Sequence, residues 1–303
     1  MPHFAFAHSP LDRMSHIRND ALKVGKYRES QDAKFIWVHG DGVQFAGEKL
    51  DVSRPLSFMP SIFLGLDDKA KPWFAVAAPP SDSLKPIRGI MIDTLLPRTV
   101  LSIIAQARSL IHWHESHGFC AKCGVASVMQ DEGYRRHCNA CGTDHFPRTD
   151  PVVIMAVCHG NRTLLGRQKS WPEGMYSALA GFMEPGETME AAVRREVKEE
   201  VGITVGKVEY VACQPWPFPS SLMIGMIGEA EDDVLTIDES EIETARWFEG
   251  DEIRMMLERT HPQGLHASRP DAIAWHLVRA ALVRIEGPSP SRYASLLSRK
   301  REK

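Results

Sequence analysis

The 303-residue chain lacks several features that would place it in a specialised class of protein. No stretch approaches the roughly 20 apolar residues of a membrane span, and no basic segment followed by a long apolar run opens the chain. We therefore expect neither a membrane helix nor a secretory signal, and a cytoplasmic location. A formal net charge of −3 gives no general footprint for nucleic acid. With 43% hydrophobic and 25% charged residues and no internal repeat, the composition is that of a globular protein.

Cysteine is scarce, and the six cysteines do not suggest a disulfide framework. Four of them form two Cys-x2-Cys pairs separated by fourteen residues: Cys120, Cys123, Cys138 and Cys141. Two such pairs suit a tetrahedral Zn²⁺ site, and redox-active or disulfide-bonded pairs are the alternatives. Four thiolates leave no open coordination position, so the zinc would be structural. The other two, Cys158 and Cys213, are expected to be small core residues of apolar strands.

The most informative stretch is GFMEPGETMEAAVRREVKEEVGI, from Gly181 to Ile203. Thr188 can cap a helix in this stretch and Gly202 can end it. On that helix Glu199 and Glu200 lie three and four residues after Glu196, so all three are expected on one face. Packed like charges repel unless a cation lies among them. The alternative is a solvated charged helix, which is typical of Glu-rich amphipathic segments.

The spacing G-x5-E-x7-R-E-V-x-E-E-x-G-I resembles the Nudix hydrolases, which cut a pyrophosphate that joins a nucleoside to another group. The resemblance implies that Glu196 and Glu200 bind Mg²⁺ or Mn²⁺ together with the backbone carbonyl of Ala180. It makes Glu199 either a further metal ligand or the base that activates water. The remaining fixed positions would shape this segment: Gly181, Glu187, Arg195 and Gly202.

A second motif lies ten residues further on, where three prolines alternate with two aromatic residues. Proline fixes φ and removes a backbone donor, so a stiff extended loop is expected that presents Trp216 and Phe218. Such rings could stack on a base or on nicotinamide, or the loop could instead cover the core or a dimer interface. The order of the two motifs resembles the NADH pyrophosphatase family, although Cys213 stands where that family often has Ser. The resemblance implies substrate contacts from Gln214, Pro215, Trp216, Pro217, Phe218, Pro219, Ser220 and Ser221.

Three isolated residues gain a role only from this resemblance. Glu241 belongs to an acidic run and would complete the metal site. Phe146 stands where the family often has a substrate-contacting Tyr, and Ala274 aligns with another substrate contact. Phe146 and Ala274 could equally be core residues.

The chain divides into four predicted segments. Residues 1–115 predict a small sheet-rich domain, which the resemblance makes Nudix-like, and residues 116–147 predict the zinc ribbon. Residues 148–288 predict the Nudix hydrolase domain, an α/β/α sandwich with a mixed sheet. Its strands are expected at residues 152–158, 163–167, 176–180, 208–213, 222–230 and 244–248. Residues 289–303 form a basic tail, interpreted as a solvated terminus.

The motifs together predict a metal-dependent enzyme that splits NADH or NAD⁺ into nicotinamide mononucleotide and AMP. Removal of an NAD cap from RNA is a close alternative, because the same bond is cut. A zinc-ribbon module that binds protein or nucleic acid without catalysis is a distant one. Family resemblance also implies a homodimer.

Overall fold

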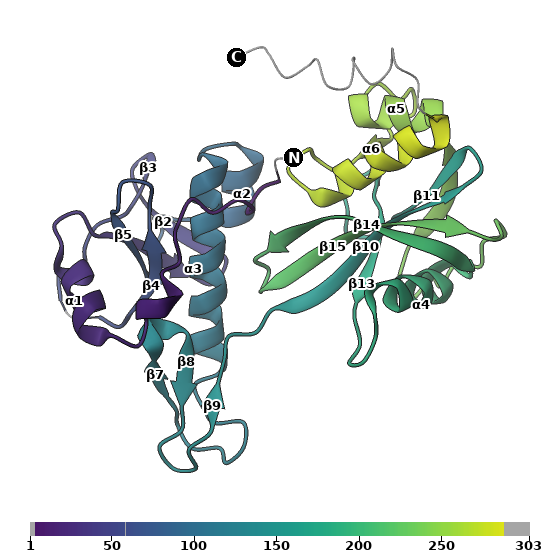
Figure 1. Cartoon of the computed structure of the whole chain (residues 1–303). Coiled ribbons are helices and arrows are strands. Elements are labelled where there is room, and N and C mark those ends of the chain that lie inside the picture. The colour runs from purple at the N-terminus through teal and green to yellow at the C-terminus, as the bar shows by residue number, and fades with distance from the viewer. Residues whose placement is uncertain (1–3, 58, 288–303) are drawn as a thin grey trace. The chain divides into compact units, whose positions relative to one another are not determined.

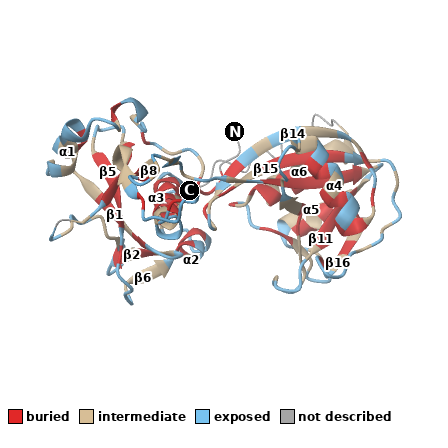
Figure 2. Cartoon of the chain, turned by 90° about the horizontal axis from the view of Figure 1, so that it is seen from below, coloured by how far each residue is buried: buried red, intermediate tan, exposed pale blue. Residues whose placement is uncertain are grey.

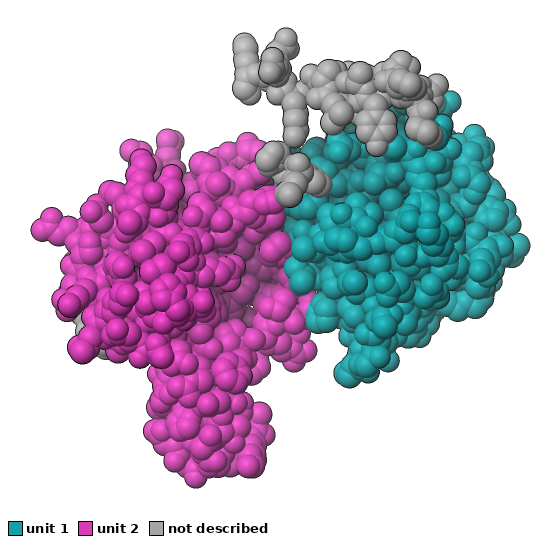
Figure 3. All heavy atoms as spheres, viewed as in Figure 1, with its two compact units in different colours: residues 1–4, 151–214, 222–303 teal, residues 5–150, 215–221 magenta. Residues whose placement is uncertain are grey.

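The computed structural model describes residues 4–57 and 59–287, which form two compact units (Figure 3). Unit 1 joins Met1–Phe4, Pro151–Gln214 and Leu222–Lys303, and unit 2 joins Ala5–Asp150 and Pro215–Ser221. The proline-aromatic loop therefore belongs to the same unit as the N-terminal half of the chain. The predicted basic tail, 289–303, lies outside the described residues. No helix among the described residues is long and apolar enough to cross a membrane.

Unit 2 is built on a six-stranded sheet of order β3-β2-β1-β5-β4, with β6 paired to β2. The parallel pairing of β1 with β5 mixes with antiparallel pairings elsewhere in this sheet. Its elements are η1 (Ser15–Ile17), α1 (Ala21–Glu29), β1 (Lys34–His39), β2 (Gly42–Ala46), β3 (Lys49–Leu50), β4 (Ser61–Leu66), β5 (Pro72–Ala77), β6 (Leu84–Pro86), α2 (Ile87–Ile92) and α3 (Arg98–Ser116).

Strand alternation explains the two sides of this sheet. Phe35, Phe63 and Phe74 are buried in one cluster with residues of α1. Their sequence neighbours Ile36 and Leu64 point the opposite way, into a cluster with residues of α3. Burying each such side chain stabilises the unit by about 1.5–3 kcal/mol. The sheet is thus held between α1 and α3 (Figure 1).

The zinc-ribbon segment projects from α3 as a three-stranded sheet of order β7-β8-β9 (Figure 1). Its elements are β7 (Val128–Gln130), η2 (Asp131–Gly133), β8 (Arg135–His137) and β9 (Asp144–His145). The strands are too short to enclose a hydrophobic core, so a bound metal is the natural source of stability for this segment.

Unit 1 is an α/β/α sandwich, which confirms the predicted fold class. Its sheet has the order β14-β15-β10-β11-β16, with β13 paired to β10. The elements are β10 (Asp150–His159), β11 (Arg162–Arg167), β12 (Met175–Tyr176), β13 (Leu179–Phe182), α4 (Met189–Val201), β14 (Val205–Trp216), β15 (Ser221–Ala230), β16 (Thr244–Glu249), α5 (Gly250–Glu258), β17 (His266–Ala267) and α6 (Ile273–Glu286). The short strands β12 and β17 pair in parallel beside this sheet.

The two faces of this sheet are covered by different helices. Leu164 packs in the cluster that holds the apolar side of α4, whereas Leu165 packs with Met256 of α5 and Val278 of α6. Figure 2 shows the buried residues concentrated between these layers. Cys158 is buried as predicted, but the prediction for Cys213 is wrong. Cys213 is exposed, because β14 is the edge strand and the outward face of an edge strand has no covering layer.

Candidate metal centres and substrate loop

An acidic cluster forms where α4 meets the segment before β16. Glu196, Glu200 and Glu241 each offer a carboxylate oxygen, and these oxygens lie within 4.8 Å of one another. Glu196 and Glu200 come from consecutive turns of α4. Glu241 is brought to them because the Asp238 amide donates to the Glu200 carbonyl at 2.9 Å, and the Glu241 amide donates to the Asp238 carbonyl at 3.1 Å.

The electrostatics of this cluster favour a cation. Glu200 is only 5% exposed, and its Oε2 atom is buried without a hydrogen-bond partner. Burial raises the pKa of Glu200 to about 8, and the charges of Glu196 and Glu241 add to this effect. Burial also raises the pKa of Glu196. Three carboxylates with an unpartnered buried oxygen form a hard-oxygen donor set of the kind that Mg²⁺ and similar ions prefer.

A glycine lets the helix approach the sheet at this point. Gly181 lies in β13, directly after Ala180, and pairs with Val153 of β10. A Cβ atom at Gly181 would lie 1.9 Å from Cδ of Glu196, so no other residue fits without moving that carboxylate. Ala180, whose carbonyl is predicted as a metal ligand, is therefore the strand residue directly before the one that contacts Glu196.

Arg195 organises the other acidic residues of the helix. Its Nε and Nη2 atoms bind the two carboxylate oxygens of Glu187 at 2.7 and 2.9 Å, and Nη2 also donates to the Phe182 carbonyl. The Arg195 guanidinium lowers the pKa of Glu187 to about 2. Its Nη1 atom lies 2.9 Å from both Glu196 Oε1 and Glu199 Oε2. Glu187 is therefore committed to holding Arg195, which in turn fixes the orientation of Glu196.

Glu199 differs from the two glutamates beside it. Its side chain is 54% exposed and is paired with Arg195, four residues earlier. It does not join Glu196, Glu200 and Glu241 in the close cluster. The structure thus brings together two of the three glutamates expected on one face, and adds Glu241.

The helix that carries these residues has both ends defined by its own sequence. The Thr188 side chain accepts a hydrogen bond from the Ala191 amide at the N-terminus. Gly202 ends the helix with φ of +76°, a left-handed conformation that glycine adopts without strain. Lys198 lies in the last turn and donates to the Gly202 carbonyl at 2.7 Å.

The four paired cysteines converge at the tip of the ribbon. Sγ atoms of Cys120 and Cys141 lie 3.6 Å apart, and those of Cys123 and Cys138 lie 3.5 Å apart. Ligands of a tetrahedral Zn²⁺ with Zn–S bonds of about 2.3 Å would be separated by about 3.8 Å. The residues present therefore fit a structural zinc ion.

Each cysteine pair forms the same turn. The Gly124 amide donates to the Cys120 carbonyl at 2.9 Å, and the Gly142 amide donates to the Cys138 carbonyl at 2.8 Å. Both glycines have φ near +70°, at +74° and +72°, which explains their place after the second cysteine of each pair. His145 adds an imidazole nitrogen 3.3 Å from Cys120 Sγ, outside the four-sulfur set.

The proline-aromatic loop packs within unit 2. Rings of Trp216 and Phe218 meet Phe6 edge-on, with centroids 5.8 and 5.9 Å from it. Arg108 of α3 donates to the Pro219 carbonyl at 2.7 Å, and the Ser220 carbonyl accepts from the Asp150 amide at 3.0 Å. Both rings remain half-buried, so each keeps an open part of its surface.

The loop also differs from the expectation in its first residues. Strand β14 continues through Pro215 and ends at Trp216, whereas an extended loop was predicted from Gln214 onward. Proline is tolerated there because β14 lies at the edge of the sheet, where a missing amide donor need not break a ladder. Pro217 is buried, while Pro215 and Pro219 are exposed.

Gln214 has a supporting place in the structure. It is fully buried, its amide nitrogen donates to the Asp271 carbonyl at 2.9 Å, and its amide oxygen accepts from the Ile273 amide at 2.7 Å. These bonds tie the end of β14 to the start of α6. These bonds give Gln214 a positioning role, and its predicted substrate contact stays a prediction. Ala274 is also buried, one residue into α6.

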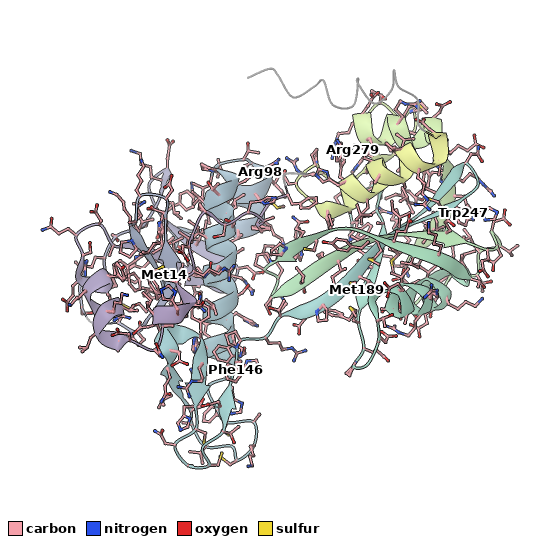
Figure 4. The ribbon with its side chains drawn as sticks, in the orientation of Figure 1. Met14, Arg98, Phe146, Met189, Trp247 and Arg279 are labelled. Carbon is pink, nitrogen blue, oxygen red and sulfur yellow. The ribbon has the colours of Figure 1, made fainter. Side chains whose placement is uncertain are left out.

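Two further residues complete the description. Phe146 follows β9 and is 65% exposed; it lies at the end of the ribbon next to α3, away from the cysteine tip (Figure 4). Arg88 was not among the predicted site residues; its guanidinium lies 4.1 Å from the Phe218 ring centre and 5.5 Å from that of Trp216. No ion pair involves Arg88 within the described part of the chain. Its position in sequence carries no signal, because only the fold brings α2 to the loop.

Comparison with known proteins agrees with this arrangement. Residues 148–269 match the NUDIX domain, residues 115–146 the NADH pyrophosphatase zinc ribbon domain, and residues 17–113 the NADH pyrophosphatase-like rudimentary NUDIX domain. The NAD-capped RNA hydrolase NudC of Chromobacterium violaceum is 39% identical over 190 residues, which cover 63% of this chain and 68% of the relative.

Human relatives match over a smaller share of their length. NAD-capped RNA hydrolase NUDT12 is 48% identical over 187 residues, covering 58% of this chain and 40% of the relative. Mitochondrial NAD(P)H pyrophosphatase NUDT13 is 42% identical over 167 residues, covering 53% of this chain and 47% of the relative. The chain thus spans less than half the length of these human relatives.

Among solved structures, a Nudix hydrolase from Nitrosomonas europaea aligns with a TM-score of 0.44 and 25% identity, covering 56% of this chain and 93% of that one. The three matched domains follow one another in the order expected from the ribbon cysteines and the acidic helix. The chain belongs to the Nudix hydrolase superfamily, in its NADH pyrophosphatase family.

Proposed function

We propose that this protein hydrolyses the pyrophosphate bond of nicotinamide adenine dinucleotides, giving nicotinamide mononucleotide and AMP. The observation that carries the proposal is the cluster of Glu196, Glu200 and Glu241, with its buried and unpartnered Glu200 oxygen. Such a site suits a cation that also binds the oxygens of a diphosphate. The names of the relatives, two NAD-capped RNA hydrolases and an NAD(P)H pyrophosphatase, support this substrate class.

Mg²⁺ or Mn²⁺ is the proposed catalytic cofactor, held by these three carboxylates and by the Ala180 carbonyl. Such an ion supplies charge neutralisation at the phosphates and lowers the pKa of bound water. The chain's own residues then have separate tasks. Glu196 and Glu200 are buried, and Arg195 also holds Glu196. Glu199, exposed and outside the close cluster, is the proposed acceptor of the proton of the attacking water, and the role of a further metal ligand is the alternative.

The loop is the proposed recognition element for the dinucleotide. The exposed parts of Trp216 and Phe218 offer stacking surfaces, which are worth about 1–3 kcal/mol per base in related complexes. Arg88 adds a cation beside both rings, within the same unit. The proposal keeps the other predicted substrate contacts: Phe146, Gln214, Pro215, Pro217, Pro219, Ser220, Ser221 and Ala274.

Removal of NAD caps from RNA is the second candidate function. The relatives NUDT12 and NudC are named for this activity, and the bond that is cut is the same. An exposed stacking loop accepts the nicotinamide end of either substrate. Turnover of free NADH and of NAD-capped RNA, measured side by side, separates the two.

Three accompanying proposals concern the rest of the chain. One Zn²⁺ held by the four cysteines stabilises residues 116–147, between the Nudix-like domain at 1–115 and the hydrolase domain at 148–288. The assembly is a homodimer. A reducing compartment such as the cytoplasm would keep the four thiols available for zinc.

The decisive experiment compares two variants that make the same substitution on the same helix. Glu200→Gln is expected to abolish release of AMP from NADH, while Glu190→Gln, outside the cluster, keeps it. Products from NADH, NAD⁺, ADP-ribose and diadenosine substrates define the specificity. Near-native turnover by a folded Glu200→Gln protein would refute the proposed function.

A further inference from the structure

One cavity lined by residues of unit 2 has no part in the proposed reaction. It measures about 630 Å³ and is lined by residues of α1, β4 and the ribbon turn at η2, including Arg18, Ala21, Arg28, Met129 and Arg135. That size lies within the range of pockets that bind small metabolites. Apolar surface comes from Pro60, Met59 and Met129, and charge comes mainly from arginine.

The arginines of this cavity are not equivalent. Arg28 pairs with Glu132 and also donates to the Ser61 hydroxyl, and Arg135 pairs with Asp131 at 2.8 Å. Arg18 forms no ion pair with a carboxylate within residues 4–57 and 59–287. The cavity therefore carries one positive charge that its own acidic residues do not neutralise.

Arg18 is held in place without having its charge satisfied. Its guanidinium lies over the Tyr134 ring at 3.4 Å, and Nη2 donates to the Arg13 carbonyl at 2.9 Å. The Nε atom is buried and has no hydrogen-bond partner. Among the described residues, the guanidinium charge is met only by the Tyr134 ring and one backbone carbonyl.

The start of helix α1 strengthens the positive potential at the cavity. Ala21, the first residue of this nine-residue helix, lines the cavity. The Asp20 side chain caps the Lys23 amide, which leaves the amides of Ala21 and Leu22 without a protein partner in the described structure. Helix N-termini attract anions through such amides and through the helix dipole.

The opposite wall is a rigid turn. Asp131 and Glu132 have φ of +49° and +52°, a left-handed conformation that costs energy for residues other than glycine. Their ion pairs with Arg135 and Arg28 hold the turn, and His114 Nε2 lies 2.8 Å from the Gly133 carbonyl. The cavity is therefore preformed rather than created by a ligand.

We propose that this cavity binds a small organic oxyanion, with its phosphate or carboxylate group on Arg18 and the first amides of α1, and its body against Pro60 and Met129. The proposal is independent of the dinucleotide reaction, because every residue named belongs to unit 2 and none belongs to the acidic cluster.

The test uses the full-length protein without added divalent cation and a matched pair of variants. Ala21→Glu places a negative charge at the rim, where the helix dipole favours it and the fold is preserved, and Ala21→Gln is its neutral counterpart. Inorganic phosphate and AMP are titrated as phosphate probes, and acetate and succinate as carboxylate probes, by calorimetry.

We expect at least one probe to bind the native protein and Ala21→Gln alike, and to bind Ala21→Glu about tenfold more weakly or worse. Arg18→Met, which keeps most of the stem over Tyr134, should lose binding as well, whereas Arg13→Met retains it. Which probe binds identifies phosphate or carboxylate as the preferred group. Equal affinity of every probe for Ala21→Glu and Ala21→Gln, or no binding of any probe to the native protein, overturns the proposal.

Discussion

Replacing Glu200 by Gln should make the metal-free protein more stable while removing its activity. The side chain is 5% exposed and close to two further carboxylates. Its pKa is about 8 in the folded protein, against an ordinary value of 4.5. The folded state therefore holds a proton that the unfolded state releases, so stability falls as pH rises from about 4.5 to 8.

The size of the effect follows from these two pKa values. At pH 7 the pH lies 2.5 units above the pKa that Glu200 has in the unfolded state. At 1.36 kcal/mol per unit, folding stability is then lower by about 3 kcal/mol than near pH 4.5. Above pH 8 this loss of folding stability levels off at about 5 kcal/mol. Gln has the shape of the protonated acid and carries no charge, so it avoids this loss. For a unit of roughly 150 residues, 3 kcal/mol raises Tm by about 6–12 °C.

The assay is thermal and urea unfolding of the native protein, Glu200→Gln and Glu190→Gln between pH 4.5 and 9 without divalent cation. The advantage of Glu200→Gln should be absent near pH 4.5 and grow with pH, while Glu190→Gln shows no such growth. Saturating Mg²⁺ should stabilise the native protein more than the variant, because the ion compensates the buried charge. A Glu200→Gln advantage that does not change with pH, or a loss of stability at pH 8, would show that the buried charge is not the cause.

Three further outcomes are expected. Glu199→Gln should lower kcat at least tenfold with little change in Mg²⁺ affinity, and a main effect on cation affinity would instead make Glu199 a ligand. Cys123→Ser should reduce the zinc content from about one ion per chain to near zero and lower the Tm of the ribbon, as measured by metal analysis and calorimetry. Cys213→Ser should leave the zinc content and the Tm unchanged. Gly181→Ala should displace the Glu196 carboxylate and raise the Mg²⁺ concentration needed for half-maximal activity; an unchanged requirement contradicts the packing described.

Local features of the fold could be predicted from the sequence because their causes are local. Helix α4 has its cap at Thr188, its stop at Gly202 and an apolar face between them, all within one segment. The zinc ribbon could be predicted from the spacing of its four cysteines and from the glycine after each pair. Helices α1 and α5 were not predicted, since each has nine residues and only one or two buried positions, too few for a clear helical period.

Contacts between distant segments explain most of what the sequence could not show. Trp216 and Phe218 pack against Phe6, more than 200 residues earlier, and no periodicity signals such a contact. The parallel pairing of β1 with β5 is equally nonlocal. Glu241 was assigned only by family resemblance, and its place depends on the hydrogen bonds that join Glu241 to Asp238 and Asp238 to Glu200 of α4.

The acidic helix shows why spacing alone does not separate the environments of its glutamates. Residues four apart on a helix form stripes, so Arg195 and Glu199 share one stripe and Glu196 and Glu200 share the next. In the first stripe the guanidinium satisfies an exposed carboxylate at 2.9 Å. In the second both carboxylates are buried and meet Glu241. Burial, which the sequence pattern does not contain, separates an exposed glutamate from two buried ones whose charges a cation would compensate. That division is the physical basis on which we propose Glu199 as the proton acceptor and Glu196 and Glu200 as metal ligands.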